Sequence, residues 1–388
     1  MSSNFAIAES EKEYSQKLEI KKRLLNYYSE QMFKNGLSSL EKVKLYLPLE
    51  LQPLALRRGV AIAHLNIEPI IEKIANGEGF TVVSGLNPSS PLHLGHKVLF
   101  DLLFDLQKLG ANIFIPLTND ESVVDGKAKN LAESRKIARE SILPDIVAMG
   151  FKSEKTKIYI DSEYPELYNL AMRLSQEVTL AQLVSVFGKE SLLTPGQIFY
   201  RGVVQMAQIL LPQLPEFGGS KVTLIPVGID QHPYVLLARD VAKKIGMIPP
   251  SELVIRFLPS LLDPEAKMSG SKPNTAIFLS DTADEIKRKI NRAYTGAVSS
   301  LDVYQKMGGV PEICSVFALL NFLNPNDESV KQIKNHYKKG QITMKKLKEI
   351  ATGFVVGLIG QCQQNRVTSL KILDNFILKT PLDSLLRI

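Results

Sequence analysis

Cysteine is scarce in this sequence: only Cys314 and Cys362 occur in 388 residues. Two cysteines exclude both a disulfide framework and a four-cysteine metal site. Long apolar runs are missing as well, since none reaches the ~18 residues that a membrane-spanning helix needs. The first residues also lack the pattern of a secretory signal peptide. Together these absences predict a cytoplasmic protein without a membrane partner.

Glycine-rich phosphate loops of the two common kinds are absent. Neither G-x-G-x-x-G nor the P-loop sequence Gly-Lys-Ser/Thr occurs, which excludes the phosphate cradles of dinucleotide enzymes and P-loop NTPases.

Charge of one sign does not dominate, because 47 Lys and Arg against 40 Asp and Glu leave a net charge of +7. This small excess is compatible with a polyanionic partner but does not demand one. The basic residues of 331–350 form either a solvated helix face or a phosphate-contacting surface.

What is present begins with a strand, a helix and a second strand. The segment FTVVSGL (80–86) predicts a buried strand, because it is apolar, rich in β-branched residues and ends at a turn. A helix with a broad apolar stripe follows from Leu94 to Leu109 and ends at Gly110. NIFIPL (112–117) predicts the next strand. This order is a βαβ unit, which implies a parallel sheet with a right-handed crossover.

A second strand–turn–helix half occurs later in the chain. KVTLIPVGID (221–230) predicts a strand, and HPYVLLARDVAKKIG after it predicts an amphipathic helix. A mostly helical insertion is expected at about 129–212, with one strand candidate at 157–161. The sequence thus predicts an α/β fold, a split Rossmann-like parallel-sheet domain with a helical insertion, followed by an all-α C-terminal domain. The expected divisions are an N-terminal helical segment, the sheet domain and the C-terminal domain, at 1–75, 76–281 and 282–388.

The loop SGLNPSSPLHLGH (84–96) joins the first strand to its helix and carries two histidines. His93 and His96 are three residues apart in the first helical turn, where helix N–H groups favour an anion. Gly95 between them permits a ligand to approach the backbone closely. A zinc pair and a purely structural pair are the alternatives; the zinc reading lacks a nearby third ligand. The loop therefore favours a nucleotide or another anion.

Two further segments carry polar residues that could contact a bound ligand. GIDQ (228–231) ends the later strand, where Asp230 could hold a ribose and Gln231 a polar ligand group. AKMSGSKPN (266–274) is either an exposed polar loop or a mobile flap that brings Lys267 and Lys272 onto a charged leaving group. Each segment alone is a weak signal.

Taken in this order, H-x-G-H, G-x-D-Q and K-M-S-x-S resemble the signatures of class I aminoacyl-tRNA synthetases. The longer stretches SGLNPSSPLHLGH, GIDQHPYVLLARDVAKKIG and KMSGSKPNTAIFLSDT are similar to the tryptophanyl-tRNA synthetases of the archaeal and eukaryotic type. The resemblance begins at LRRGV (56–60) and covers roughly residues 55–350.

This resemblance implies a two-step reaction and a set of partners. The carboxylate of L-tryptophan attacks the α-phosphate of ATP, with Mg²⁺ sharing the phosphate charge, and the acyl group then passes to tRNA(Trp). The helical C-terminal domain would read the anticodon, and the helical insertion would form a homodimer. No DNA partner and no protein-bound metal site are implied.

The resemblance also assigns roles to individual residues. Those implied in catalysis are His93, His96, Lys267 and Lys272. Those implied in binding ATP are Gly85, Ser90, His93, Gly95, His96, Gly228, Asp230, Lys267, Met268, Ser269 and Ser271. Those implied in binding the amino acid are Val83, Glu121, Gln205 and Gln231. One carboxylate and two amide oxygens among the last group suit an ammonium ion.

The sequence departs from the family pattern at several positions. Gly270 replaces the second lysine of K-M-S-K-S, and Lys272 follows where an acidic residue is common. Val83 and Pro116 stand where this branch has a tyrosine and a glutamine near the indole nitrogen. The tyrosyl relative matches no better, since its pocket tyrosine would also fall at Val83 and its aspartate near Gln208. Three alternatives stay open: a paralogue that activates another amino acid such as tyrosine, a non-catalytic tRNA-binding homologue, and a nucleotidyltransferase without a tRNA partner.

Overall fold

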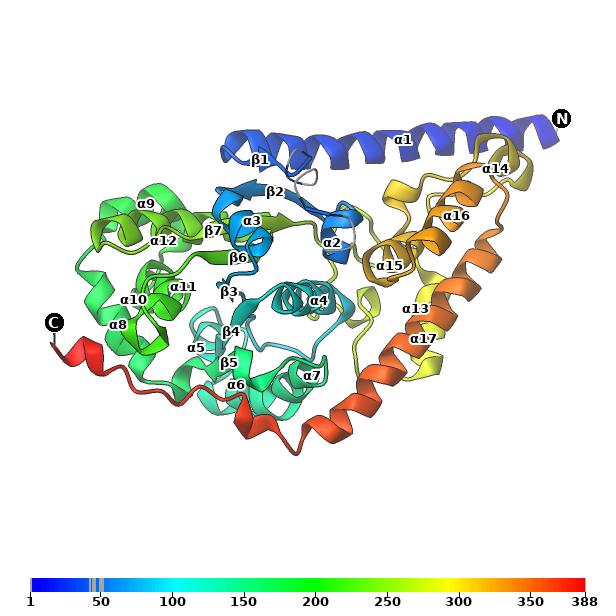
Figure 1. Ribbon diagram of the computed structural model, residues 1–388. Helices are drawn as coiled ribbons and strands as arrows, with labels where there is room; N and C mark the ends of the chain where they lie inside the picture. The colour runs from blue at the N-terminus through cyan, green and yellow to red at the C-terminus, as the bar shows by residue number, and fades with distance from the viewer. Residues whose placement is uncertain (1, 42, 44–46, 49–51, 388) are drawn as a thin grey trace. The chain divides into compact units, whose positions relative to one another are not determined.

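Backbone contacts divide the chain into two units (Figure 1). The computed structural model describes residues 2–41, 43, 47–48 and 52–387. The helical unit comprises Met1–Gly36, Leu92–Val98 and Phe257–Gln364. The sheet unit comprises Leu37–Pro91, Leu99–Arg256 and Asn365–Ile388. None of the described helices is both long enough and apolar enough to cross a membrane.

A seven-stranded mixed sheet forms the centre of the sheet unit. Its strands are β1 Ser38–Ser39, β2 Ala61–Leu65, β3 Phe80–Val83, β4 Ala111–Leu117, β5 Thr156–Ile160, β6 Thr223–Val227 and β7 Ser251–Ile255. Their order is β1-β2-β7-β6-β3-β4-β5. The five strands from β7 to β5 are parallel, and β2 pairs antiparallel with β7 and β1. The parallel part of this sheet agrees with the predicted fold, whereas its antiparallel edge was not predicted.

The strand order contains one switch point, between β3 and β6. From β3 the chain moves outward through β4 to β5, and from β6 it moves the opposite way to β7. In open α/β sheets, ligands bind outside the carboxyl ends of the strands at such a point. The loops that follow β3 and β6, residues 84–91 and 228–231, therefore occupy the expected ligand-binding position of this unit.

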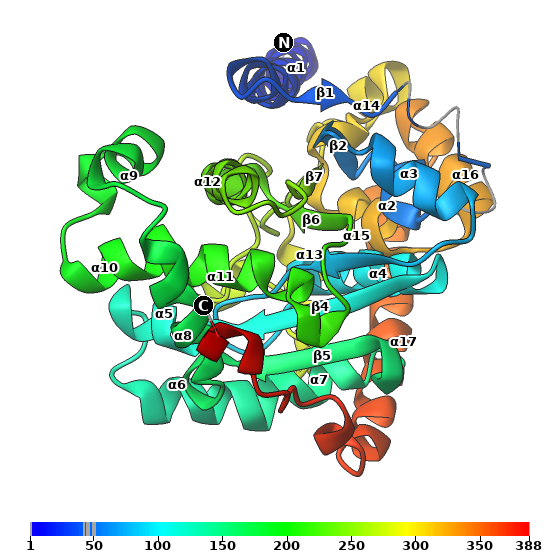
Figure 2. The ribbon, with the colours of Figure 1, turned by 60° about the vertical axis from the view of Figure 1, so that its left-hand side comes forward.

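Strand register decides which side chains share a face of the sheet. Val83 pairs with Phe114, and Pro116 pairs with Tyr159, so these four residues lie on one face. Three of them, all except Pro116, belong to a buried cluster that also contains residues of α8, α11 and α12. Figure 2 shows α11 and α12 near this part of the sheet. The loop residues after these strands are thus held on a packed layer.

The helices of the sheet unit include α12, where the sequence predicts an amphipathic helix, and others that were not predicted individually. They are α2 Leu54–Arg57, α3 Glu68–Ala75, α5 Asn119–Val124, α6 Leu131–Ile137, α7 Leu143–Val147, α8 Glu166–Ser175, α9 Leu180–Phe187, α10 Pro195–Phe199, α11 Gln205–Leu210 and α12 His232–Lys244. The chain passes between the two units within α4 (Leu94–Lys108) and α17 (Met344–Ser369). Leu102, Leu103 and Leu106 of α4 are buried, as its apolar stripe predicts. Gly110 ends the turn after α4 with a φ of 107°, which favours glycine.

The helical unit contains α1 Ser2–Lys34, α13 Ala283–Arg292, α14 Leu301–Met307, α15 Ser315–Leu323 and α16 Asp327–Lys338, besides its parts of α4 and α17. A capping box of Thr282 and Glu285 begins α13, whose buried face is formed by Ile286, Lys289 and Ile290.

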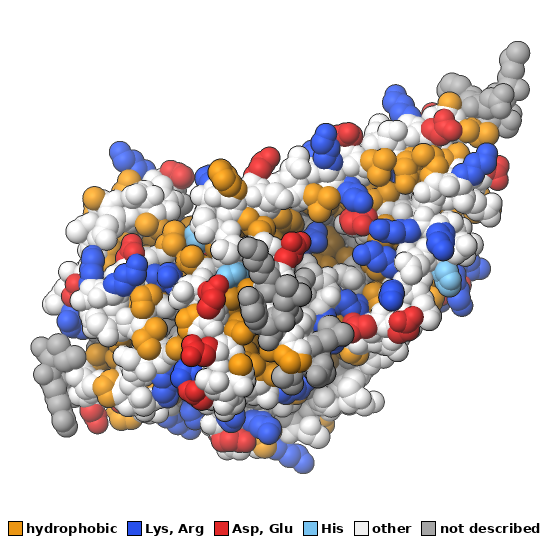
Figure 3. All heavy atoms as spheres, turned by 45° about the horizontal axis from the view of Figure 1, so that its top comes forward, with side chains coloured by type: hydrophobic (Ala, Val, Ile, Leu, Met, Phe, Trp, Pro, Cys, Tyr) orange, Lys and Arg blue, Asp and Glu red, His pale blue; other side chains and the backbone are white. Residues whose placement is uncertain are grey.

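On the face drawn in Figure 3, Lys and Arg side chains lie among Asp and Glu side chains, in keeping with a net charge of only +7.

Three strands depart from the expected pattern. β1 and β2 lie in the N-terminal part of the chain, which was expected to be helical, and β7 was not predicted at all. β2 is the five-residue sequence AIAHL, and an apolar run this short does not distinguish a strand from a helix by periodicity. Its pairing with β7 determines its conformation. The strands predicted at 80–86, 112–117, 157–161 and 221–230 are confirmed as β3, β4, β5 and β6.

A segment near the C-terminus covers the outer edge of β5. Ile158 N donates to Phe376 O (2.8 Å), and Leu378 N donates to Ile158 O (2.9 Å). Phe376 and Leu382 are each only 1% exposed, so apolar packing also holds this segment. Figure 2 shows it running along β5. The pairing satisfies backbone groups that an edge strand would otherwise expose.

Candidate active site

Two histidine rings are stacked at the beginning of α4 in the helical unit. The ring centroids of His93 and His96 are 3.8 Å apart, and their planes are inclined by 21°. His93 lies just before the helix and is 5% exposed. Its backbone pairs with Phe278 in an antiparallel bridge, which fixes the approach to the helix.

Hydrogen bonds and burial determine the protonation of both rings. His93 Nδ1 accepts from Gly95 N (3.1 Å), and His96 Nδ1 accepts from His93 N (3.3 Å). Each neutral ring therefore carries its proton on Nε2. Burial, then the neighbouring His96, lowers the pKa of His93 to about 2. Burial, then the charge of Lys267, lowers the pKa of His96 to about 4. The pair consequently offers two neutral N–H donors at pH 7.

Lys267 and Met268 belong to a short antiparallel hairpin with residues 258–260. The charge of Lys267 acts on the ring of His96. A Cβ built on Gly95 would lie 3.7 Å from Met268 Cβ, so the backbone of the H-x-G-H sequence closely approaches this hairpin. The structure therefore brings the two predicted phosphate-binding motifs together within the helical unit.

The residues after Met268 form an exposed polar segment. Ser269 and Ser271 form a hydrogen bond between their hydroxyl groups (3.0 Å). Lys272 N donates to Ser269 O (3.3 Å), and the Lys272 residue is exposed. Such a segment presents hydroxyl, amide and ammonium donors, which suit an anionic ligand.

Glu121 of α5, in the sheet unit, is held by two donors. Asn87 Nδ2 (3.1 Å) and Thr118 Oγ1 (2.9 Å) both donate to its Oε2. Ser122 Oγ donates to Asn87 Oδ1, which fixes the orientation of that amide. Burial raises the pKa of Glu121, although Lys127 and the two donors oppose the rise. A cationic ligand group would favour the ionised form of this buried carboxyl.

Gln205 and Gln231 meet in the same unit. Gln205 Nε2 donates to Gln231 Oε1 (2.9 Å). Gln205 Oε1 is buried and has no hydrogen-bond donor among the described residues. Leaving such an acceptor unsatisfied is unfavourable, so a ligand N–H group would stabilise it. Burial, then the charge of Glu121, raises the pKa of Tyr234 in α12 to about 12, so Glu121 acts on the helix that follows Gln231.

The remaining predicted residues lie at the ends of β3 and β6. Ser90 is half-buried, and its Oγ donates weakly to Pro91 O (3.4 Å). Gly228 follows β6 and precedes the 3₁₀ turn that contains exposed Asp230. Val83 is buried at the end of β3 and offers no polar group.

Gly85 allows the loop after β3 to approach β4. A Cβ at this position would lie 2.0 Å from Pro116 O, the atom that accepts the Leu86 N–H. We expect Gly85→Ala to lower the free energy of unfolding by about 1–3 kcal/mol, as overpacking does. Urea denaturation measures the change. Gly79→Ala is the matched control, because its Cβ would meet no atom closer than Gly110 O at 4.0 Å; equal losses for both variants would contradict the prediction.

Several polar residues near the site are not indicated by any motif of the sequence. Asn87 and Thr118 orient Glu121, and only the proximity of Asn87 to the predicted loop could have indicated this. Asp161, after β5, is fully buried, and burial together with Asp120 raises its pKa well above the usual range. Asp120 accepts from Tyr168 Oη (3.0 Å) and shares this buried network. Nothing local in the sequence joins these residues, because they come from separate elements.

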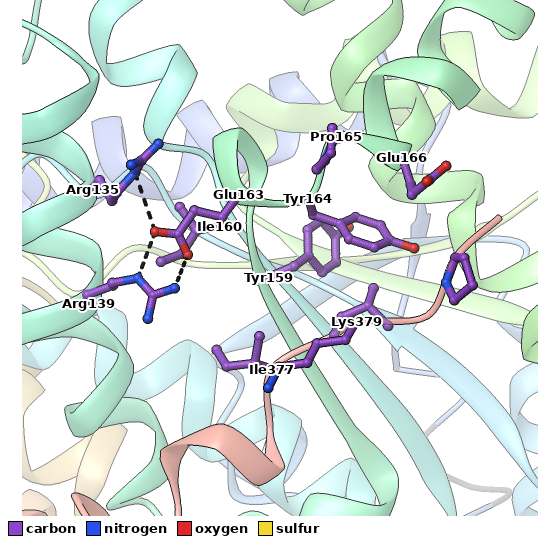
Figure 4. A pocket seen from close by; sticks show the side chains of 12 residues that line it. Arg135, Arg139, Tyr159, Ile160, Glu163, Tyr164, Pro165, Glu166, Ile377 and Lys379 are labelled. Atoms are coloured by element: carbon purple, nitrogen blue, oxygen red, sulfur yellow. Dashed lines mark hydrogen bonds and ion pairs between the residues drawn. The ribbon is translucent and has the colours of Figure 1, made fainter.

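A cavity of about 550 Å³ in the sheet unit is separate from the predicted residues (Figure 4). Its lining includes Tyr159, Tyr164 and the C-terminal segment, but no predicted site residue. Glu163 already binds Arg135 (3.3 Å) and Arg139 (2.7 Å) beside it. These guanidinium groups are therefore engaged within the protein, and we assign no ligand to this cavity.

The parallel sheet and the polar groups near its switch point define a doubly wound α/β protein of the ligand-binding kind. A family model described as "tRNA synthetases class I (W and Y)" matches residues 75–358. The chain belongs to this family.

Individual relatives agree with the family match. The chain is 36% identical over 318 residues to a tryptophan–tRNA ligase of Methanocaldococcus jannaschii, covering 80% of this chain and 84% of that protein. The structure is similar to the tryptophanyl-tRNA synthetase of Aeropyrum pernix, with a TM-score of 0.81 and 29% identity over 91% of this chain and 96% of the other. The corresponding values for the Giardia lamblia tryptophanyl-tRNA synthetase are 0.82 and 25%, over 92% and 98%.

Proposed function

We propose that this protein is an enzyme that activates L-tryptophan with ATP and transfers it to tRNA(Trp). The match to this chain covers more than four-fifths of the length of relatives named tryptophan–tRNA ligase, which supports the same activity here. The observation that carries the proposal is the stacked pair of His93 and His96 beside Lys267, within the matched family region.

The helical unit would act on the phosphates of ATP. His93 and His96 would donate Nε2–H groups to phosphate oxygens, and Gly95 would allow the adenosine to approach. Lys267, buried Met268, half-buried Ser269 and the exposed residues Ser271 and Lys272 would bind the departing pyrophosphate. The tryptophan carboxylate oxygen forms a bond to the α-phosphorus while the bond to pyrophosphate breaks, and fixed donors stabilise the charge that develops.

The sheet unit would bind the amino acid and the nucleoside. Glu121, Gln205 and Gln231 supply a carboxylate and amide oxygens for the ammonium group, supported by the raised pKa of Glu121 and the unsatisfied Gln205 Oε1. Asp230 would lie near the ribose, with Gly85, Ser90 and Gly228 lining the nucleotide. Val83 would contact the indole ring, and neither it nor Pro116 offers a side-chain acceptor to the indole N–H group.

Further parts of the proposal concern partners. No group of three or more His, Cys, Asp or Glu side chains in the described ranges could hold a metal. Mg²⁺ would enter bound to the phosphates of ATP, as it often does. Residues 282–388 would form the domain that binds the tRNA anticodon. Residues 76–281 would form the catalytic domain, and residues 1–75 a separate N-terminal segment. Exposed Met172 and Leu180 support a homodimer formed through the helical insertion. We place the protein in the cytoplasm.

ATP–pyrophosphate exchange with labelled pyrophosphate tests the proposed function. We expect exchange that depends on tryptophan, with a kcat/KM at least about 10²-fold above those for tyrosine and phenylalanine. Charging of tRNA(Trp) should follow in the presence of the same amino acid. Exchange that responds best to tyrosine would assign a different substrate, and exchange with none of the amino acids would contradict an activating enzyme.

A further inference from the structure

One segment of the helical unit is paired directly with the backbone around His93. Leu94 N donates to Ile277 O (2.9 Å), and Leu279 N donates to Leu92 O (2.9 Å). Between these bonds, His93 and Phe278 face one another in an antiparallel bridge. Their ring centroids are 6.2 Å apart at an angle of 73°, an edge-to-face contact. The position of residues 277–279 therefore determines the surroundings of the His93 ring.

A buried ion pair fixes this segment from its other side. Lys289 Nζ lies 2.6 Å from Asp281 Oδ2, and the two side chains are 6% and 9% exposed. The same Oδ2 accepts the Phe278 N–H (2.9 Å), while Asp281 N donates to Phe278 O (3.1 Å). Gln363 Nε2 of α17 donates to the carbonyls of Leu279 (2.9 Å) and Asp281 (3.2 Å). Residues 278–281 thus form a closed turn, and the carboxylate of its last residue, Asp281, is neutralised by Lys289.

Lys289 also contacts the ring that touches His93. Its ammonium nitrogen is 4.9 Å from the centroid of Phe278, within cation–π range. The Phe278 ring therefore lies against a buried cation and against an imidazole. Burying the ammonium group of Lys289 and the carboxylate of Asp281 is unfavourable unless each group has a close partner of opposite charge, as each has here. A buried charge pair at this position is consequently better suited to fixing geometry than to increasing stability.

We propose that Lys289 and Asp281 are positioning residues for the His93 imidazole, acting through Phe278. The inference rests on the proposed function, because it assigns to His93 a donor role toward ATP. It predicts that the ion pair controls the rate of adenylate formation rather than the binding of tryptophan. A small displacement of a donor from the reacting phosphate is enough to reduce the rate strongly.

The first test compares three substitutions on α13 in ATP–pyrophosphate exchange. Lys289→Met is expected to lower kcat by about 10- to 10²-fold, with the KM for tryptophan within about twofold of the wild type. Lys289→Arg retains the charge and should recover most of the rate. Lys287→Met, at an exposed position of the same helix, should leave kcat unchanged. Equal kcat values for Lys289→Met and Lys287→Met would overturn the proposal.

A double-mutant cycle with His93→Ala separates positioning from general destabilisation. If Lys289 acts through His93, adding Lys289→Met to His93→Ala should change kcat by less than about threefold, because the affected donor is already gone. Additive losses would overturn the proposal. The double variant Asp281→Asn/Lys289→Met removes both charges. It should fold even where Lys289→Met alone, with its unpaired carboxylate, does not. This double variant is then combined with His93→Ala in the same cycle. Absence of exchange in the wild type would instead contradict the proposed function.

Discussion

Replacing His96 with alanine is expected to lower kcat of tryptophan-dependent ATP–pyrophosphate exchange by about 10²- to 10³-fold, the typical cost of removing one fixed donor to a developing negative charge. The KM for tryptophan should change little, because the proposed function places His96 at the phosphates of ATP and not at the amino acid. His93 stacks on the same ring at 3.8 Å, so the alanine variant also removes one of the two rings that His93 contacts and leaves the edge-to-face contact with Phe278. Exchange kinetics with ATP and tryptophan varied separately would measure both parameters.

His96→Gln provides the control, because its amide can present an N–H group near the position of Nε2. It should recover part of the rate, whereas alanine should not. The pKa values of about 2 and about 4 for His93 and His96 mean that both rings stay neutral above about pH 5. The wild-type rate should therefore show no acid limb near pH 6.5 from these rings. A limb there that disappears in His96→Gln would show that a charged imidazole is needed.

Replacing Glu121 with glutamine should reduce kcat/KM for tryptophan by roughly 10²-fold, since one hydrogen bond between charged groups contributes about 1.5–3 kcal/mol. The side chain keeps its size, and Asn87 and Thr118 can still donate to an amide oxygen. The KM for ATP should stay within about twofold. Steady-state exchange at varied tryptophan concentrations gives the effect.

The pH dependence gives a second readout for Glu121. Burial raises its pKa, so protonation occurs at a higher pH than for an exposed glutamate. The wild-type kcat/KM for tryptophan should therefore fall as the pH decreases through that raised pKa, because the neutral acid attracts the ammonium group less. This limb should be absent from Glu121→Gln and present in Glu163→Gln, which alters a carboxylate beside the separate cavity. An unchanged limb in Glu121→Gln would contradict the assignment.

The sequence predicted the central strands and the proximity of His93 and His96, for physical reasons. β3, β4 and β6 are buried on a packed layer, so their apolar runs are distinctive. His93 and His96 are close in sequence, so one helical turn is enough to bring them together. The role of each residue in the reaction is still a prediction.

What the sequence could not predict depends on distant partners. AIAHL becomes β2 because β7, far along the chain, pairs with it. Lys289 would count as an ordinary basic residue of an amphipathic helix until Asp281 and Phe278 are seen around it. Asn87 donates a hydrogen bond to Glu121, which lies on another element. Such contacts leave no periodic pattern along the chain, and only the fold reveals them.

The cover on the edge of β5 has a consequence for biosynthesis. Ile158 pairs with Ile377, a residue made about two hundred positions later. At a synthesis rate of 5–20 residues per second, β5 emerges on the order of 10 to 40 s before its partner. During that interval its backbone groups could pair with another nascent chain. Expression should therefore benefit from slower initiation or added chaperone, which keep neighbouring ribosome products apart until translation has passed this point.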